Sequence, residues 1–392
     1  MEIIGVVGLG TMGAGIAQLA LEAGHEVVVH DVDDEAIEQG IARIREGLGR
    51  RGSKLDLDAD SLDDWVDGRL AGLHASPTLD GVAAEADVIV EAALEDLGLK
   101  QSIFRALDAG AGPGAVLASN TSALSIADIA AVTSGPGRVV GLHFFNPAPV
   151  MPLVEVVAAA TSDAQIVERA AALVEAWGKT TVRCRDVPGF IVNRVNRPFT
   201  LEALAMVEAR EASVSAIDLA VRGAGFPMGP FELMDLVGID VNLAAARGVW
   251  EGLGKADRFR PSPIQERLVS EERLGRKTGG GFYEYAAGRE AEVAEEFSGG
   301  ADLAPELIVA RIWLAVVAEA WRALGDGIAT AADIDVALRL GAGHPVGPFE
   351  RTDQLGGPGA VTSQLTALSK HGPRFTAPPA LTKAATGERR QG

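Results

Sequence analysis

The opening segment of the chain restricts the possible folds more than any other feature. "EIIGVVGLGTMGAGIAQLALEAGHEVVVHD" (residues 2–31) begins with an almost uninterrupted apolar run at 3–7, as expected of a strand buried on both faces. A GxGxxG turn follows at 8–13, and residues 11–23 have the composition of a helix. A second apolar run, 27–29, ends at Asp31. The order strand, turn, helix, strand predicts the start of a mostly parallel sheet.

Each glycine of this turn has a physical role in binding a dinucleotide. The first permits a tight turn, the second lets a pyrophosphate approach the backbone, and the third allows close helix–strand packing. The helix N-terminus offers N–H groups to the phosphates, and Asp31 is suited to the adenosine ribose hydroxyls but repels a 2′-phosphate. We therefore predict NAD rather than NADP, with a glycine turn that binds no nucleotide as the alternative. The predicted contacts are Gly8, Gly10, Thr11, Met12, Gly13 and Asp31.

Further strand and helix patterns alternate after this segment. Apolar runs at 86–92, 115–120 and 138–145 predict strands separated by helices, and "PLVEVV" and "TTVRCR" add later strands. The predicted fold is a Rossmann-like, doubly wound α/β domain over 1–186, followed by an all-α region. Ligands of such sheets bind beyond the carboxyl ends of the strands. Glu91, Glu95, Asn120, Ser122 and His143 all follow predicted strands.

A histidine and a glutamate interrupt two neighbouring apolar runs in "HFFNPAPVMPLVEV" (143–156). If His143 ends one strand and Glu155 lies on the next, a turn through the prolines at 147–152 brings the two side chains together. A carboxylate beside imidazole fixes the tautomer and stabilises the imidazolium, which makes the ring a competent proton acceptor. Beside a nicotinamide, this pair is suited to removing a hydroxyl proton as hydride leaves the carbon. Taken alone, either residue is also compatible with a purely structural role.

Six segments in succession resemble the L-3-hydroxyacyl-CoA dehydrogenase family. They are "GLGTMGAGIA", "SNTSALSI", "GLHFFNPAPVMPLVEVV", "DVPGFIVNR", "GAGFPMGPFELMDLVGID" and "GRKTGGGFYEY". The resemblance covers roughly residues 1–286 and implies that His143 is the catalytic base and Glu155 its partner. It further implies substrate contacts from Ser122 and Asn193, and NAD contacts from Glu95 and Lys100. The latter two are equally compatible with surface charges, and Asn193 with helix packing.

A basic stretch stands out from an acidic chain. "RIREGLGRRGSK" (43–54) lies in a protein whose formal net charge is -19. Arginine forks suit phosphate, so the stretch is a candidate site for the CoA phosphates, and a solvated helix face is the equally weighted alternative. The candidate residues are Arg43, Arg50, Arg51 and Lys54.

The helical region contains a repeat. "RGAGFPMGPFELMDLVG" around Pro227 returns as "RLGAGHPVGPFERTDQLG" around Pro345, a spacing of about 118 residues that signals a duplicated domain. We predict a first helical domain over 187–286, a linker over 287–303, a diverged second copy over 304–380 without an active site, and a disordered tail over 381–392. Single-copy members of the family pair through this domain. The expected state is therefore a monomer with an internal pseudo-dimer, or a homodimer.

Composition excludes several other classes. The negative charge disfavours a nucleic-acid or membrane-surface protein, no segment is suited to spanning a bilayer, and no spacing typical of a metal site appears. Cys184 is the only cysteine, which together with the absence of a signal-peptide pattern predicts a cytoplasmic protein.

Three functional hypotheses remain open at this stage. The first is NAD-dependent oxidation of an L-3-hydroxyacyl-CoA to the 3-ketoacyl-CoA, in fatty-acid β-oxidation or related CoA-thioester metabolism. The second is a dehydrogenase of a free hydroxy acid on the same fold. The third is an inactive NAD-binding scaffold, which has no need of His143, Glu155, Ser122 or Asn193.

Overall fold

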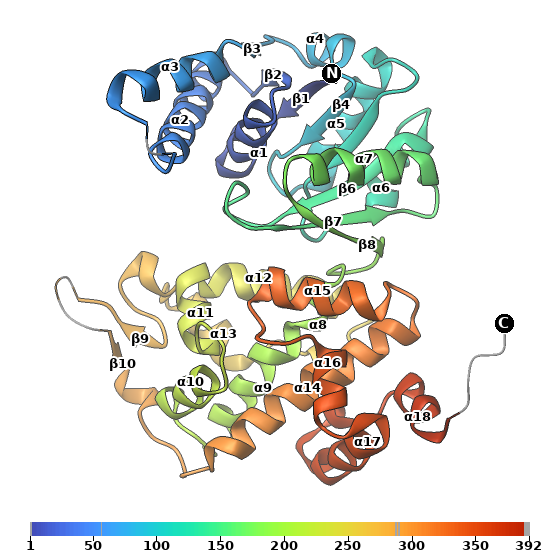
Figure 1. Ribbon diagram of the computed structural model, residues 1–392. Coiled ribbons are helices and arrows are strands. Elements are labelled where there is room, and N and C mark those ends of the chain that lie inside the picture. Colours follow the sequence, from blue (N-terminus) through green and yellow to red (C-terminus); the bar gives the residue numbers. More distant parts are fainter. Residues whose placement is uncertain (1, 56, 287, 289–290, 388–392) are drawn as a thin grey trace. The chain divides into compact units, whose positions relative to one another are not determined.

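A computed structural model describes residues 2–55, 57–286, 288 and 291–387. The chain divides into two compact units, residues 1–186 and residues 187–392. The first is an α/β unit and the second is almost entirely helical (Figure 1). The first unit follows from the alternation of strand and helix patterns in the sequence, and the second from a succession of helical patterns.

An eight-stranded sheet forms the centre of the first unit, in the order β3-β2-β1-β4-β5-β6-β7-β8. The strands from β1 to β6 are parallel to their neighbours, β7 runs antiparallel to β6, and β8 is parallel to β7. The strands are β1 (Ile3–Val7), β2 (Glu26–His30), β3 (Leu73–Ala75), β4 (Val88–Glu91), β5 (Val116–Ser119), β6 (Val139–Phe144), β7 (Leu153–Ala158) and β8 (Thr180–Arg185).

Helices cover both faces of this sheet, which is why its strands are apolar on both sides. One face of the sheet packs against a large core that includes Ile4 and Val6 of β1. On the other face, Val82 and Ala86 pack so closely against Gly5 that a Cβ there would lie 2.7 and 3.0 Å from them. The doubly wound α/β fold predicted from the sequence is confirmed. The helices are α1 (Thr11–Glu22), α2 (Asp34–Gly52), α3 (Ala59–Leu70), α4 (Leu79–Glu85), α5 (Leu97–Gly110), α6 (Ile126–Ala130) and α7 (Ala164–Ala176).

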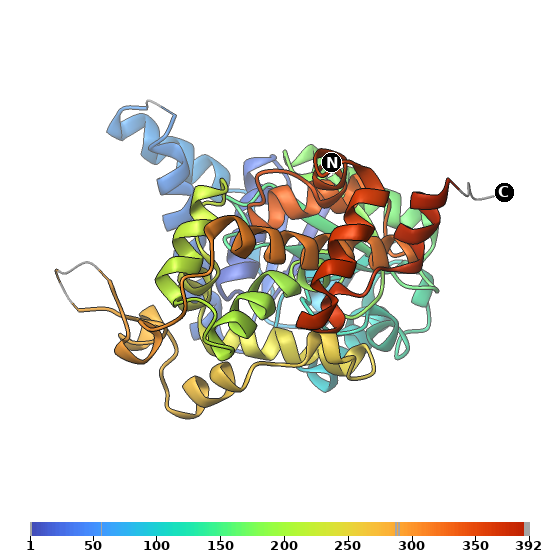
Figure 2. The ribbon, with the colours of Figure 1, turned by 90° about the horizontal axis from the view of Figure 1, so that it is seen from below.

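The second unit contains two successive sets of helices. The first set is α8 (Val192–Val195), α9 (Arg197–Glu208), α10 (Val214–Gly223), α11 (Pro230–Val237), α12 (Ile239–Gly252) and α13 (Pro263–Ser270). The second set is α14 (Pro305–Gly325), α15 (Ala331–Ala342), α16 (Pro348–Gln354), α17 (Gly357–Leu368) and α18 (Pro379–Thr386). Orange and red helices of the second set lie against the green and yellow helices of the first (Figure 2).

The same hydrogen bonds recur in both sets. Asp218 on α10 accepts from the backbone N–H groups of residues 231 and 232, at 3.0 and 3.1 Å. Asp335 on α15 accepts from those of residues 349 and 350, at 2.8 and 3.2 Å. In each set a glycine packs against this carboxylate so closely that a Cβ would clash, Gly229 in the first and Gly347 in the second. The sequence repeat is therefore also a structural repeat, and we call the two sets the first copy and the second copy.

Contacts between the two copies are reciprocal. A Cβ on Gly225 of the first copy would lie 3.4 Å from Pro345 of the second, and a Cβ on Gly343 of the second would lie 3.1 Å from Pro227 of the first. Gly225 and Gly343 are equivalent positions of the repeat, and so are Pro227 and Pro345. Such an exchange of equivalent contacts is the property of a two-fold symmetric interface. The copies pair as two subunits of a symmetric dimer would.

The structure corrects the expected linker over 287–303 for the part that it describes. Val293 pairs with Tyr283 in a two-stranded sheet of β9 (Tyr283–Glu284) and β10 (Glu292–Val293). Phe297 is buried, with its ring centroid 5.1 Å from that of Phe282. Residues 287 and 289–290 of the expected linker lie outside the described residues. Two apolar side chains in an otherwise polar segment are enough to pack it onto the first copy.

The expected disordered tail also begins too early. Helix α18 extends to Thr386, and Leu381 within it is fully buried. Pro379 at the first helical position favours the start of this helix. Residues 388–392 of the expected tail lie outside the described residues.

Candidate active site

The glycine turn has the geometry that close backbone packing requires. Gly8 has a φ of 88°, which side chains rarely adopt. A Cβ on Gly13 would lie 1.7 Å from the carbonyl oxygen of Gly8, so only glycine fits there. A Cβ on Gly10, in contrast, would meet nothing within 4 Å. The backbone of the turn is therefore closely packed at Gly13, whereas the space beside Gly10 is free of other protein atoms. Gly10 directly precedes Thr11 and Met12 at the start of α1.

Asp31 lies beside the glycine turn, directly after β2. Its Oδ2 atom accepts a hydrogen bond from the backbone N–H of Leu9 at 2.6 Å, and its Oδ1 atom accepts from that of Val32 at 2.7 Å. The backbone N–H of Gly8 donates to the backbone carbonyl oxygen of His30 at 2.9 Å. The carboxylate is therefore held at the edge where the ribose of a dinucleotide binds in folds of this kind.

A buried ion pair lies under the carboxyl end of β4. Lys100 Nζ is 2.7 Å from Glu91 Oε1, and the two side chains are 1% and 0% exposed. Ser119 donates to the other oxygen of Glu91 at 2.7 Å. A buried charge is stable only when it is paired and hydrogen-bonded, and this pair meets that condition. Such burial favours a supporting role for Lys100 beneath the site over a direct contact with NAD.

Glu95 connects this pair to the loop that contains Ser122. Its Oε1 atom accepts from Thr121 Oγ1 at 2.6 Å, from the Ser122 backbone N–H at 2.9 Å and from Ser122 Oγ at 3.2 Å. Burial opposes ionisation, but these hydrogen bonds and the charge of Lys100 hold the pKa of Glu95 below its ordinary value. The ionised carboxylate therefore orients the loop, and with it Ser122.

The predicted pair of His143 and Glu155 consists of direct neighbours in the sheet. His143 on β6 pairs in register with Glu155 on β7, so their side chains point to the same face. His143 Nδ1 lies 2.6 Å from Glu155 Oε2, and the residues are 6% and 0% exposed. The ring of Phe145 packs on the imidazole, with centroids 4.6 Å apart. The carboxylate fixes the proton on Nδ1, which leaves Nε2 as the basic nitrogen of the ring.

Asn120 is a site residue to which the sequence analysis assigned no role. Its Oδ1 atom accepts from the backbone N–H of Phe144 at 2.9 Å, which ties the end of β5 to the end of β6 beside His143. A polar residue directly after a predicted strand was the available signal. Glu91 likewise stands at the end of a predicted strand, although its partner Lys100 looks like a surface residue in the sequence.

The last predicted catalytic residue, Asn193, lies on α8 in the helical unit. The preceding turn has left-handed backbone at Gly189 and Phe190, with φ values of 78° and 48°. Phe190 and Ile191 are buried, which anchors the turn. In the second copy the equivalent of "FIVNRV" (190–195) is "LIVARI" (307–312), so that Ala310 replaces Asn193.

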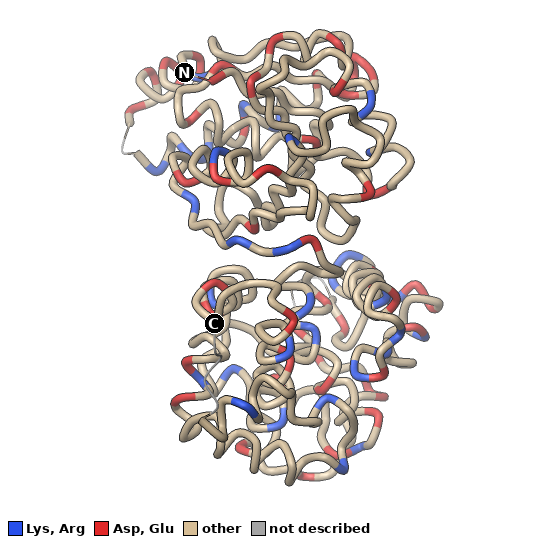
Figure 3. Tube along the Cα trace, turned by 90° about the vertical axis from the view of Figure 1, so that its right-hand side faces the viewer, with Lys and Arg blue, Asp and Glu red and all other residues tan. Residues whose placement is uncertain are grey.

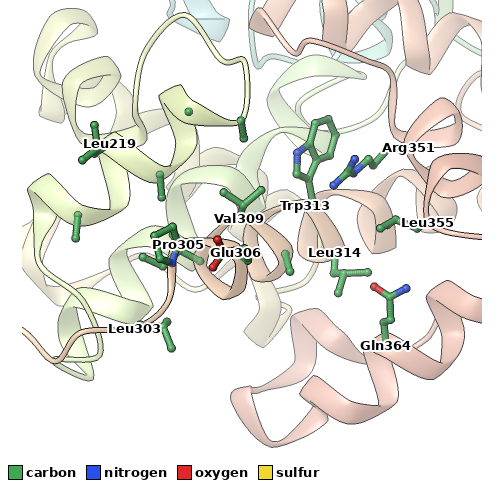
Figure 4. A pocket seen from close by; sticks show the side chains of 16 residues that line it. Leu219, Leu303, Pro305, Glu306, Val309, Trp313, Leu314, Arg351, Leu355 and Gln364 are labelled. Atoms are coloured by element: carbon green, nitrogen blue, oxygen red, sulfur yellow. The ribbon is translucent and has the colours of Figure 1, made fainter.

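Ala310 lines an apolar cavity of about 650 Å³ between the two copies, with Leu219 of the first copy and Trp313, Leu314 and Arg351 of the second (Figure 4). The hydrogen-bonding amide of the first copy has thus been replaced by a methyl group. This supports the prediction that the second copy has no active site.

The arginines of the basic stretch contact different partners. Arg43 donates to the carbonyl oxygen of Leu9 in the glycine turn, at 3.3 Å. Arg50 forms an ion pair with Glu46, and Arg51 lies 3.5 Å from Glu22. Positive and negative residues are interspersed along the chain (Figure 3). Exposed pairs of this kind contribute about 0–1 kcal/mol, so a phosphate can compete for these arginines.

Two structural absences bear on the class of protein. In the ranges that the structure describes, no group of three or more His, Cys, Asp or Glu side chains gathers as a metal site would require. Among these same residues, no helix has both the length and the apolar character needed to cross a membrane.

The glycine turn and the acidic residue after the second strand are typical of NAD-dependent dehydrogenases, and the buried His–Glu pair is compatible with that class of enzyme. Comparison with known proteins narrows this class. Residues 3–187 match the NAD-binding domain of 3-hydroxyacyl-CoA dehydrogenase, and residues 189–285 and 307–390 match the C-terminal domain of the same family.

Individual relatives agree with these matches. A 3-hydroxyadipyl-CoA dehydrogenase of Escherichia coli is 44% identical over 299 residues, which are 76% of this chain and 62% of the relative. The mitochondrial hydroxyacyl-coenzyme A dehydrogenase of Rattus norvegicus is 41% identical over 282 residues, 71% of this chain and 90% of the relative. The crystal structure of a 3-hydroxybutyryl-CoA dehydrogenase from E. coli K12 has a TM-score of 0.89 and 34% identity, and covers 99% of this chain and 98% of that one.

The chain therefore belongs to the 3-hydroxyacyl-CoA dehydrogenase family and is an NAD-dependent enzyme of that class.

Proposed function

We propose that the chain oxidises the 3-hydroxyl group of an L-3-hydroxyacyl-CoA to the 3-ketone, with the His143–Glu155 pair as general base. The observation that carries this proposal is the 2.6 Å contact between two buried side chains paired in register on β6 and β7. Paired titratable side chains that are buried in this way occur often at functional sites, which supports a proton-transfer role for this pair. The expected pathway is fatty-acid β-oxidation or related CoA-thioester metabolism.

The residues present fit the cofactor. The opening at Gly10 leaves the backbone accessible to a pyrophosphate, and Asp31 is positioned for ribose hydroxyls. When bound, NAD⁺ supplies the acceptor for the hydride that leaves C3 of the substrate. Gly8, Gly10, Thr11, Met12, Gly13 and Asp31 form the binding residues, with Glu95 and Lys100 as support.

His143 accepts the hydroxyl proton at Nε2 as the carbon–oxygen double bond forms. The resulting imidazolium keeps its Nδ1 proton and donates a hydrogen bond from it to Glu155, whose negative charge stabilises the cation. Ser122 and Asn193 hydrogen-bond the substrate near the reacting oxygen, which holds it in the reactive orientation. The proton then leaves to solvent and restores the neutral ring.

The tandem copy takes the place of a partner subunit in this proposal. The reciprocal glycine–proline contacts are those of a symmetric pair, and both halves come from one chain. A monomer with an internal pseudo-dimer is therefore the proposed state, and a homodimer is the alternative.

The reaction class is tested by mixing the purified protein with NADH and either acetoacetyl-CoA or free acetoacetate. We expect rapid loss of NADH absorbance with the thioester alone. Turnover of the free acid at a similar kcat/KM would favour a hydroxy-acid dehydrogenase. Silence with both substrates, although NADH binds, would favour a scaffold.

The basic stretch makes a separate prediction. If Arg50 and Arg51 bind the CoA phosphates, replacing both with alanine raises the KM for acetoacetyl-CoA about ten-fold, because two charge-assisted hydrogen bonds are lost. The kcat is expected to stay unchanged. Arg45→Ala is the matched control, since Arg45 lies on the same helix in an exposed ion pair with Asp67. An unchanged KM in the double variant would favour a solvated helix face.

A further inference from the structure

The helix that contains Asn193 is too short to be stable by itself. Helix α8 has four residues, Val192–Val195, whereas isolated helices need about 12–15 residues to persist in water. Its position must therefore come from contacts with other elements. A residue that orients a substrate has to be held accurately, since a displacement of about 1 Å costs roughly 100-fold in rate.

The first such contact comes from the second copy. Arg194 on α8 is 2% exposed, and its Nε atom donates to Glu319 Oε1 on α14 at 2.9 Å. Arg258 of the first copy donates to the other oxygen of Glu319, also at 2.9 Å. Glu319 is fully buried. Its carboxylate is thus held between two arginines of the first copy, one of which is the immediate neighbour of Asn193, and Arg322 of the second copy lies 3.3 Å from it.

The second contact lies at the residue directly after α8. His344 Nε2 is 2.7 Å from Oδ1 of Asn196, the residue that ends the helix. Burial lowers the pKa of His344 to about 3, so the ring is neutral. Because an amide oxygen only accepts, Nε2 carries the proton and donates it to Asn196. The second copy therefore holds the C-terminal half of α8 and the residue that ends it.

The symmetry of the two copies supplies a built-in comparison. Glu202 on α9 is also fully buried, and it is held between Arg311 and Arg374 of the second copy, whose Nε atoms lie 2.8 and 2.9 Å from it. Arg311 is the neighbour of Ala310, which replaces the asparagine. The same clamp is thus present twice, and only one of the two clamps adjoins a predicted catalytic residue.

The contact at the end of the helix differs between the copies. The equivalents of Asn196 and His344 are Trp313 and Phe226, which make an apolar contact with ring centroids 5.3 Å apart. A directional hydrogen bond occurs only on the side that contains Asn193. The contact between Phe226 and Trp313 is explained by packing alone. The hydrogen bond between His344 and Asn196 in addition fixes the orientation of the end of α8.

We propose that Glu319 and His344, which belong to the copy without an active site, are positioning residues for Asn193. The inference rests on the proposed role of Asn193 in substrate orientation. It gives the duplicated domain a part in catalysis beyond that of a structural support.

The test compares Glu319→Gln with Glu202→Gln in the full chain. Glu319→Gln leaves Arg194, Arg258 and Arg322 around a neutral amide, and Glu202→Gln leaves two arginines, so we expect both variants to lose thermal stability. We expect kcat with acetoacetyl-CoA and NADH to fall about ten-fold or more in Glu319→Gln and to change less than about two-fold in Glu202→Gln. The dissociation constant for NADH should be unchanged in both. Equal effects of the two variants on kcat, or no effect of Glu319→Gln, would overturn the proposal.

A second pair of variants covers the case in which Glu319→Gln does not fold. His344→Phe restores the aromatic residue of the first copy and keeps the packing, but removes the hydrogen bond to Asn196. We expect a lower kcat with unchanged NADH affinity, and an unchanged kcat would refute the positioning role. Asn193→Ala distinguishes the proposed role of Asn193 from the proposed positioning role of Glu319 and His344. If it leaves kcat intact, the proposed role of Asn193 fails together with this inference, whereas a loss in Asn193→Ala without one in Glu319→Gln and His344→Phe defeats this inference alone.

Discussion

Replacing Glu155 with glutamine is expected to lower kcat about 10²- to 10⁴-fold, the range for loss of a general base or its correct tautomer. Glutamine keeps the volume of this buried side chain but removes the charge that stabilises the imidazolium. Its amide group also donates to Nδ1, which moves the ring proton to Nε2 and leaves no basic nitrogen for the substrate. Stopped-flow measurement of NADH oxidation with acetoacetyl-CoA gives kcat, and a fluorescence titration gives the affinity for NADH.

The affinity for NADH is expected to stay at its wild-type value in Glu155→Gln. Glu168→Gln is a suitable control, because Glu168 lies in the same unit in an exposed ion pair with Arg183. A wild-type kcat in Glu155→Gln would show that the pair is structural. A parallel loss of NADH affinity would instead point to a disturbed cofactor site.

Replacing Gly10 with alanine is expected to weaken NADH binding about 100-fold without unfolding the protein. A Cβ at this position meets no protein atom within 4 Å, so the fold accommodates it. The methyl group nevertheless occupies the opening through which the pyrophosphate approaches the backbone. NADH fluorescence titration measures the affinity, and thermal unfolding without cofactor measures the stability.

Two other glycines make this prediction specific. Gly112→Ala also adds a methyl group with nothing within 4 Å, but away from the turn, and should change neither quantity. Gly13→Ala places a Cβ 1.7 Å from a carbonyl oxygen and should destabilise the unit itself. Wild-type affinity in Gly10→Ala would mean that the pyrophosphate does not bind at this turn.

Local patterns account for the parts of the fold that the sequence predicts well. The glycine turn is readable because each glycine meets a requirement set within a few residues of it, as the contact between Gly13 and Gly8 shows. The pairing of His143 with Glu155 is readable because two apolar runs joined by a short proline-rich segment form neighbouring strands. In both cases the partners are close along the chain.

Contacts between distant segments account for what was missed. Lys100 resembles a surface lysine in the sequence, and only the fold places it against Glu91, which also accepts a hydrogen bond from Ser119. The segment expected to be a linker is packed because Phe297 finds Phe282, and the expected tail because Leu381 is buried in the second copy. Composition contains no information on such partners.

The repeat shows the same division. The recurrence of "GFPMGPFE" as "GHPVGPFE" identifies a duplication in the sequence, but not how the copies meet. The ion pair of Arg194 with Glu319 joins residues 125 positions apart, and its counterpart joins Arg311 to Glu202. That equivalent residues exchange partners is visible only once the chain is folded.

By itself, the sequence determined the α/β unit, the glycine turn, the pairing of His143 with Glu155 and the duplicated helical pattern, because spacing and periodicity encode local backbone geometry. Only the tertiary structure decided which charges are buried, where the side chains of Lys100 and Glu95 lie, and that the second copy holds the C-terminal half of the helix containing Asn193. Burial and ion pairing depend on what the rest of the chain brings near a residue, and those neighbours come from segments far away in sequence.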